Sequence, residues 1–209
     1  QSYLGNSIRF LQHAWHLDCT SSSTGLSYAI ALRFTRQKAK AQNVLKELSK
    51  QELSNKDLAN VYQQMAKNIE ESDPEKALEY YKVSLDADAS NEVAVAQYAS
   101  LLRHCGRLDV AESVLRAFLE RDVDVNVLAE LAKCCQARQS NQEAYQLYRE
   151  VLDIDPKMRA SLVSFVELGA TFQSYAEIHS YVVKYLAVHP NDPEIASLYT
   201  KLSGLCGRG

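Results

Sequence analysis

The sequence predicts an all-α fold, an α-solenoid of stacked antiparallel helix hairpins. The stretch Ala144–Pro156 (AYQLYREVLDIDP) follows a pattern that begins again at positions 77, 111 and 178, so the period is 33 or 34 residues. Periods of this length are typical of stacked helical hairpins. Seven Gly and four Pro in 209 residues interrupt few helices, and an apolar content of 46% supplies a continuous core.

The repeated stretches predict the second helix of each hairpin, because their apolar residues recur at helical spacing. Each has a leucine in one shared column and a bulky apolar residue four positions earlier. The pairs are Tyr81 and Leu85, Leu115 and Leu119, Tyr148 and Leu152, and Val182 and Leu186. We expect these two columns to face the core.

A first helix precedes each second helix, with apolar residues at spacings of three and four. These residues are Val95, Tyr98, Ala99 and Leu102, then Leu128, Leu131, Ala132 and Cys135, then Leu162, Phe165, Val166 and Gly169. In the earliest regular unit the pattern fits after a shift of one, which places Tyr62, Met65, Ala66 and Ile69 in the core. The unshifted register would bury the polar residues Gln64 and Asn68.

Turn signals agree with this hairpin phase. Ser-x-x-Glu at 72–75, 140–143 and 174–177 predicts a capping box before each of three second helices. Gly106 takes the corresponding turn in the unit between. Pro156 and Pro190 end their helices, and Asp192 with Pro193 begins a last helix.

These boundaries divide the chain into three parts. Residues 1–57 are degenerate helical hairpins of the same solenoid, in which residues 41–48 match the pattern of the second helix weakly. Four repeats follow at about 58–91, 92–124, 125–158 and 159–191, and residues 192–209 form a capping helix and tail. The chain opens inside what reads as a repeat, so we expect a fragment or processed product of a longer protein.

The pattern resembles the tetratricopeptide-repeat (TPR) family. The third unit matches best, with Leu128, Leu131, Ala132, Ala144, Tyr148, Leu152 and Pro156 in the family's positions. The resemblance covers 58–205 well and 1–57 poorly. Two departures predict looser or differently angled packing: Ile178 replaces an alanine, and Phe118, Val151 and Tyr185 replace a small residue late in the second helix.

The resemblance implies a non-catalytic scaffold or adaptor, a right-handed superhelix that binds a partner peptide or amphipathic helix in its concave groove. Its groove positions correspond to Asn60, Gln63, Lys67, Val93, Ala96, Ser100, Arg103, Asn126, Ala129, Lys133 and Gln136. The amides suit a peptide backbone, and the cations suit an acidic group. Val93, Ala96 and Ala129 form a small apolar stretch that suits an amphipathic helix.

One subgroup of the family grips the C-terminal carboxylate of chaperones with lysine and asparagine side chains. The corresponding positions here hold Gln63, Lys67 and Ser100, without the asparagine pair. The sequence therefore argues against that particular ligand.

No motif predicts catalysis, a cofactor or a metal. His13, His16 and Cys19 have a metal-like spacing but no evident fourth ligand. Cys134 and Cys135 are adjacent on a helix, where core packing is the first interpretation and redox sensing the second. The chain has no phosphate-binding glycine loop and no nucleophile elbow.

The charge and the cysteines bear on partners and compartment. A formal charge of −3 disfavours nucleic acid, although residues 1–40 carry a net +4. Alternatives to the scaffold are an RNA-binding helical repeat and a regulatory or targeting segment of a larger enzyme. Five unpatterned cysteines and no run of about 18 apolar residues predict a reducing, cytoplasmic setting without membrane insertion. Self-association stays open.

Overall fold

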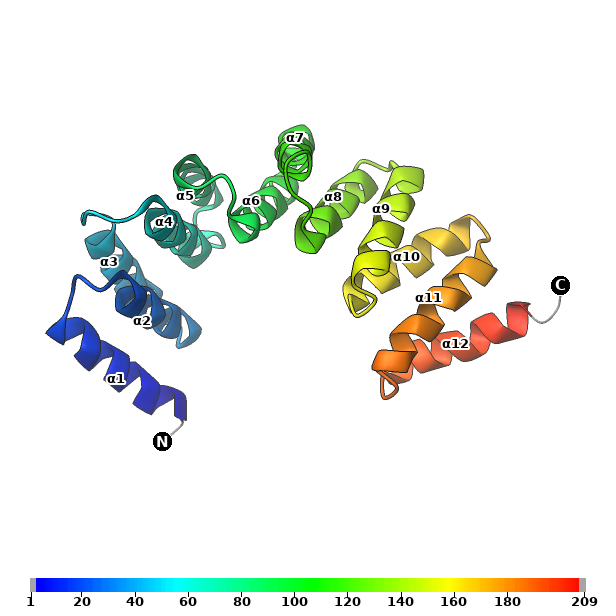
Figure 1. The fold of residues 1–209 in the computed structure, drawn as a ribbon, viewed down its shortest axis with the longest axis horizontal. Coiled ribbons are helices and arrows are strands. Elements are labelled where there is room, and N and C mark those ends of the chain that lie inside the picture. Colours follow the sequence, from blue (N-terminus) through cyan, green and yellow to red (C-terminus); the bar gives the residue numbers. More distant parts are fainter. Residues whose placement is uncertain (1–2, 207–209) are drawn as a thin grey trace. The chain divides into compact units, whose positions relative to one another are not determined.

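The computed structural model describes residues 3–206, with side chains described from residue 5 to residue 204. Within that range all twelve elements are α-helices, which confirms the predicted all-α class (Figure 1). The helices form two compact units, residues 1–107 and 108–209. The tail at 207–209 and the first two residues lie outside the described range. The division into four repeats stays a prediction.

The first unit contains six helices. They are α1 (Tyr3–Leu17), α2 (Ser22–Phe34), α3 (Lys38–Leu48), α4 (Asn55–Ile69), α5 (Pro74–Ala87) and α6 (Glu92–His104). Successive helices pack against one another, and α2 also contacts α4. The even-numbered helices therefore correspond to the predicted first helices, and the odd-numbered ones to the second helices.

The second unit continues the same alternation. Its helices are α7 (Leu108–Leu119), α8 (Val125–Ala137), α9 (Asn141–Ile154), α10 (Arg159–Thr171), α11 (Tyr175–Val188) and α12 (Pro193–Cys206). Each packs against the next along the chain. The final helix buries Ile195 and Leu202.

The deepest columns of the second helices differ in part from the prediction. The column of bulky residues is fully buried, as expected, at Tyr81, Leu115, Tyr148 and Val182. Leu152 of the leucine column is buried as predicted. In the other three repeats the column was predicted one position too late, because Leu85, Leu119 and Leu186 are only half-buried. The buried column holds Leu48, Ser84, Phe118, Val151 and Tyr185.

Helix geometry explains the correction. Each residue advances the helix by about 100°, so a side chain seven positions on points about 20° from the starting direction, whereas the eighth points about 80° away. The starting position is buried in every case, at Ala41, Ala77, Ala111, Ala144 and Ile178. The large side chains in the seventh column fill the space between neighbouring helices. Their burial argues against the looser packing that the sequence predicted, and the alternative of a different packing angle stays a prediction.

The first helices bury most of the expected residues. All four predicted positions are buried in α8 and in α10, and Tyr98 alone is half-buried in α6. In α4 the predicted shift by one is wrong. Met65 and Ala66 are buried, but Tyr62 and Ile69 are only half-buried. Val61 and Asn68 of the unshifted register are buried instead, and Asn68 is 2% exposed. Our objection to burying Asn68 was wrong because its Nδ2 donates to two acceptors on α3, the carbonyl of Lys38 and Oε1 of Gln42, both at 2.8 Å.

The predicted capping boxes do not form. Asp73 caps α5 in place of Ser72 and accepts a bond from the backbone N–H of Lys76 at 3.1 Å. Ser140 and Ser174 take the N-cap positions of α9 and α11 without a side-chain capping bond. An aspartate directly before Pro74 competes better for the cap, because proline favours the first helical position.

Most turns between first and second helices contain a residue with a left-handed backbone conformation, rather than a capping box. Gly106 has a φ of 75°, which confirms its predicted turn, and Arg36, Gln139 and Gln173 adopt similar values. After Gly106, the N–H of Arg107 bonds back to the carbonyl of Leu102 at 2.9 Å. This bond closes the helix C-terminus in the Schellman arrangement.

We predict that Gly106→Ala lowers the free energy of unfolding by about 1 kcal/mol, because alanine disfavours a positive φ. The matched control is Gly204→Ala in α12, where an added Cβ also meets no atom within 4 Å. That change should raise stability by up to about 1 kcal/mol, since alanine favours the helix. Urea titrations followed by circular dichroism measure both. Equal effects would show that the conformation of Gly106 is not the constraint.

The start of α12 predicts a response to acid. Asp192 accepts bonds from Nε of Arg159 at 2.7 Å, from the hydroxyl of Tyr185 at 3.1 Å and from the N–H of Ile195 at 3.2 Å. Chiefly because of Arg159, the pKa of Asp192 falls to about 2. A lowered pKa stabilises the fold above its ordinary value near 3.8 and loses that contribution as the pH falls toward 2.

Asp192→Asn should therefore be less stable than the wild type near neutral pH, and the difference should shrink as the pH falls from about 4 to about 2. Urea titrations at several pH values check this. Asparagine keeps the capping oxygen, so a difference that did not change with pH would assign the effect to packing rather than to charge.

Candidate partner-binding groove in the first unit

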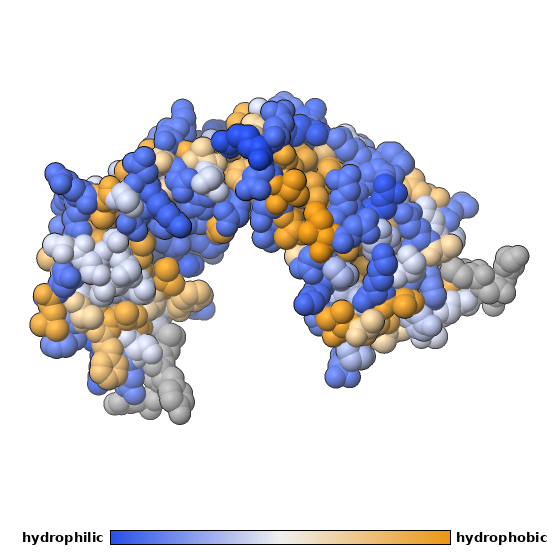
Figure 2. All heavy atoms as spheres, in the orientation of Figure 1, coloured by the Kyte–Doolittle hydropathy of each residue, from blue (hydrophilic) through white to orange (hydrophobic). Residues whose placement is uncertain are grey.

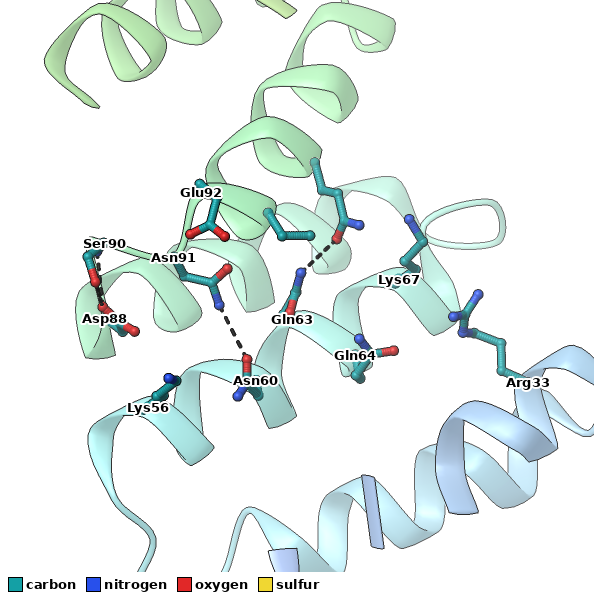
Figure 3. A pocket seen from close by; sticks show the side chains of 12 residues that line it. Arg33, Lys56, Asn60, Gln63, Gln64, Lys67, Asp88, Ser90, Asn91 and Glu92 are labelled. Atoms are coloured by element: carbon teal, nitrogen blue, oxygen red, sulfur yellow. Dashed lines mark hydrogen bonds between the residues drawn. The ribbon is translucent and has the colours of Figure 1, made fainter. Parts of the chain in front are cut away.

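A pocket of about 500 Å³ lies along α2, α4 and α6 in the first unit (Figure 3). Its lining is mostly polar: Arg33, Lys56, Asn60, Gln63, Gln64, Lys67, Asp88, Ser90, Asn91, Glu92, Val93 and Gln97. A second pocket of about 380 Å³ shares Lys67 and Gln97 with it and continues to Ser100 and His104. We call these two adjoining pockets the first-unit groove.

Amide side chains connect α4 with the start of α6 across the groove. Nε2 of Gln63 donates to Oε1 of Gln97 at 3.2 Å, and Nδ2 of Asn91 donates to Oδ1 of Asn60 at 3.4 Å (Figure 3). A primary amide has two N–H donors and an oxygen with two lone pairs. Oδ1 of Asn91 also accepts a bond from the N–H of Ala94, and Oε1 of Gln97 accepts a second bond from the hydroxyl of Tyr81 at 3.5 Å. The amide N–H groups that these bonds leave unused are available to the C=O groups of a peptide.

A buried tyrosine orients one acidic residue of the groove. Tyr81 on α5 is fully buried, and its hydroxyl donates to Oε2 of Glu70 at 3.0 Å. Burial and the neighbouring Glu70 both raise the pKa of Tyr81, so it stays a donor over the whole physiological range. The ring also contacts Tyr98, with centroids 6.3 Å apart.

The two ends of the larger pocket differ in charge. Arg33 of α2 and Lys67 of α4 extend toward the same end, and Asp88 and Glu92 lie at the other end beside Lys56 (Figure 3). Asp88 accepts bonds from the backbone N–H and the hydroxyl of Ser90, which lower the pKa of Asp88. The pocket therefore has a cationic end and a mixed, partly acidic end, with neutral amides between them.

The structure brings together most of the predicted site residues of the first unit. Asn60, Gln63, Lys67 and Val93 line the larger pocket, and Ser100 lines the smaller one. Gln63 is only 5% exposed, so it contributes mainly through its bond to Gln97. Ala96 and Arg103 are half-buried on α6 without lining either pocket, and Nη2 of Arg103 donates to the hydroxyl of Ser100 at 3.4 Å.

The remaining predicted residues, Asn126, Ala129, Lys133 and Gln136, lie on α8 in the second unit. Ala129 is 4% exposed, because α7 and α9 both pack on α8. Nζ of Lys133 pairs with Glu130 one turn earlier at 2.6 Å. Gln136 accepts a bond from the hydroxyl of Tyr148 at 2.9 Å. Lys133 and Gln136 thus have partners of their own and Ala129 is buried, whereas Asn126 is exposed. As a set they offer less to a ligand than the first-unit residues.

Sequence reasoning missed the other eight lining residues of the larger pocket, which are Arg33, Lys56, Gln64, Asp88, Ser90, Asn91, Glu92 and Gln97. Arg33 belongs to residues 1–57, where the repeat is degenerate, so its column was not assigned. The period itself holds the signal: Arg33 precedes Lys67 by 34 residues, and Gln97 follows Gln63 by 34. Extending the columns in both directions would have placed these side chains on one face.

The other candidate chemistries have little structural support. Within the described residues no three His, Cys, Asp or Glu side chains come together as metal ligands, and His13, His16 and Cys19 are exposed. Cys134 and Cys135 are buried, and burial raises the pKa of the Cys135 thiol to about 12. A thiol with this pKa is a poor nucleophile, as expected for core packing.

Among the described residues, 3–206, no helix has both the length and the apolar character that crossing a bilayer requires.

The hydroxyl of Tyr81 predicts a measurable difference between two equivalent positions. Tyr81→Phe should lower the free energy of unfolding by about 1.5 to 3 kcal/mol, because the lost bond has a charged acceptor. Tyr148→Phe, in the same column of a later repeat, loses a bond to the neutral Gln136 and should cost about 1 kcal/mol. Urea titration of both variants measures the difference. A larger loss at Tyr148 would contradict the role given to Glu70.

Comparisons with known proteins identify the fold. No family model and no curated protein matches the sequence. Among solved structures, the C-terminal part of a TPR protein from Cytophaga hutchinsonii is 14% identical with a TM-score of 0.61, covering 95% of this chain and 88% of that one. PilF from Pseudomonas aeruginosa is 16% identical with a TM-score of 0.67, covering 88% and 91%.

YrrB, described as a TPR protein with an unusual peptide-binding site, is 15% identical with a TM-score of 0.59, covering 91% of this chain and 97% of that one. At these identities the likeness concerns the fold. The chain therefore has the helical-hairpin solenoid fold of the tetratricopeptide-repeat proteins.

Proposed function

We propose that this chain is a non-catalytic interaction scaffold that binds a segment of a partner protein in the first-unit groove. One observation carries the proposal: two adjoining pockets follow α4 and α6, and amide side chains from both helices line them. Neutral amides at the base of a groove match the donors and acceptors of a peptide backbone without selecting one side chain.

The dimensions of the groove favour an extended segment. Lys56 and Lys67 lie at opposite ends of the larger pocket on α4, and the eleven residue steps from one to the other correspond to about 16 Å of helix. An extended chain of about five residues covers this length. The lining is too polar for the apolar face of an amphipathic helix, so we propose an extended peptide instead of the helix that the sequence also suggested.

The charge of the groove supports a protein partner over RNA. Arg33, Lys56 and Lys67 are balanced by Glu70, Glu71, Asp88 and Glu92 in the two pockets. A polyanionic backbone needs a cationic excess along its whole path, and exposed aromatic rings usually stack the bases. No Phe, Tyr or Trp is among the described residues that line the two pockets.

Proteins of the same fold give supporting precedent. YrrB has a peptide-binding site, and a Cut9–Hcn1 assembly contains a chain that matches this one with 9% identity and a TM-score of 0.68. That match covers 96% of this chain and 39% of the other. These precedents concern those proteins, and here they support only the class of function.

Site-specific photocrosslinking tests the proposal. A photoreactive amino acid at Val93 lines the groove, whereas one at Val183 lies on α11 of the second unit. The two valines have similar exposures, 46% and 43%, which makes them a matched pair. In extracts of the source cell, position 93 should crosslink to a partner protein several-fold more efficiently than position 183.

Tryptic mapping of the crosslinked product should identify one short segment of the partner. Equal crosslinking at both positions, or crosslinking at 183 alone, would contradict the groove assignment. Crosslinks to RNA at position 93 would replace the proposal with the nucleic-acid alternative.

A further inference from the structure

This inference rests on the proposed function and concerns one side chain of the bound segment. Gln63 lies at the base of the larger pocket, because it lines that pocket although only 5% of its surface is exposed. Its Nε2 donates to Oε1 of Gln97, whereas its own Oε1 accepts no bond from a described residue and stays open to the pocket. Buried polar groups in folded proteins are nearly always satisfied, so a donor that reaches this oxygen from the pocket completes its bonding.

Two unused donors line the pocket together with this acceptor. The bond from Gln63 occupies Oε1 of Gln97, and Nε2 of Gln97 has no partner among the described residues. Asn60 lies about one helical turn before Gln63 on α4. Its Oδ1 accepts a bond from Asn91, and its Nδ2 is likewise unused. One acceptor and two donors, from α4 and α6, therefore belong to the same pocket (Figure 3).

This set of groups matches a primary amide better than any other side chain. A carboxylate accepts bonds but has nothing to donate to Oε1 of Gln63. An ammonium or guanidinium group donates but cannot accept from Asn60 or Gln97. A primary amide carries two N–H donors and an oxygen with two lone pairs, so it satisfies the acceptor and both donors at once. A hydroxyl has one donor only, on a short stem.

The depth of Gln63 favours a side chain of the ligand over its backbone. Glu92 and Val93 also line the pocket but are exposed, Val93 to 46%, whereas Gln63 is almost fully buried. A main chain that runs past the exposed residues stays above Gln63, and a side chain can extend down to it on one or two methylene groups. The deepest amide of the groove therefore adds a selection that backbone contacts alone do not supply.

The surroundings of the amides favour an uncharged group. Cations lie at one end of the larger pocket, at Arg33 and Lys67, and carboxylates at the other, at Asp88 and Glu92. Midway between them, neither sign of charge is preferred. Polar side chains cover most of the visible face of the first unit over α4 and α5 (Figure 2). Hydrogen bonds rather than apolar contacts therefore decide which side chain binds at this place.

We propose that the first-unit groove selects an extended segment with a glutamine or asparagine at one fixed position. The amide N–H of this side chain donates to Oε1 of Gln63, and its oxygen accepts from Nδ2 of Asn60 and Nε2 of Gln97. The other amides of the groove hold the backbone on either side of it.

A peptide selection tests the proposal with the full chain. A phage-displayed library of random heptapeptides is selected on the wild type, on Gln63→Met and on Gln42→Met. Methionine keeps the length of glutamine without its amide. Gln42 is the matched control, because it is half-buried on α3 outside both pockets and its Oε1 accepts a bond from Asn68. Each substitution thus removes a side-chain hydrogen bond, and circular dichroism melting verifies that all three proteins fold.

The wild type and Gln42→Met should enrich Gln or Asn at one fixed position, and Gln63→Met should lose this enrichment. A synthetic peptide selected on the wild type should bind the wild type about tenfold or more weakly when that residue is replaced by Glu or Met. On Gln63→Met, the replacement by methionine should change the affinity by less than about threefold, because the partner group is already absent. The measurements on the wild type do not depend on the folding of either variant.

The failures are distinguishable. Selected peptides without a preference for an amide side chain would overturn this inference and leave the proposed function standing. The same preference on Gln63→Met, or an equal loss of it on Gln42→Met, would do so too, because the selection would then not depend on Gln63. No enrichment by the wild type would overturn both the inference and the proposed function.

Discussion

One-sided burial of the second helices is the constraint on which the fold depends. In each of them the starting position and the residues four and seven positions later point between the neighbouring helices, and every one of these side chains is buried, from Ala41 to Tyr185. A single hairpin cannot cover such a face alone, so stability arises from the next hairpin along the chain. On the face of the first helices that points away from this packing, the side chains are not constrained by it and can differ from one repeat to the next.

The fold was predictable because this constraint leaves a period in the sequence. The all-α class, the alternation of first and second helices and the turn at Gly106 followed from spacing and composition. The burial of Ser84 did not, since a serine in a core column becomes favourable only when its hydroxyl finds an acceptor, here the carbonyl of Ala59 at 2.7 Å. Asn68 is a second case, because its acceptors lie on another helix.

The candidate site was predictable only in part. The resemblance to the family predicted Asn60, Gln63 and Lys67 as groove residues. That prediction needs only the face of α4 on which each residue lies. The partners that decide their chemistry come from other helices: Arg33 and Gln97 beside them, and Glu130 beside Lys133 in the second unit. Spacing along a chain shows which side chains share a face, but not which charges a neighbouring helix has neutralised.

The buried hydroxyl of Ser84 also has a consequence for assembly. Hairpins built on one template are nearly interchangeable, and a chain of them risks pairing a helix with the wrong copy. A wrongly placed neighbour leaves this hydroxyl unsatisfied in an apolar interior unless one of its backbone carbonyls lies at the same depth. Ser84 therefore favours one depth and one register of α5 on its neighbour, whereas a hydrocarbon side chain such as Phe118 imposes no such requirement.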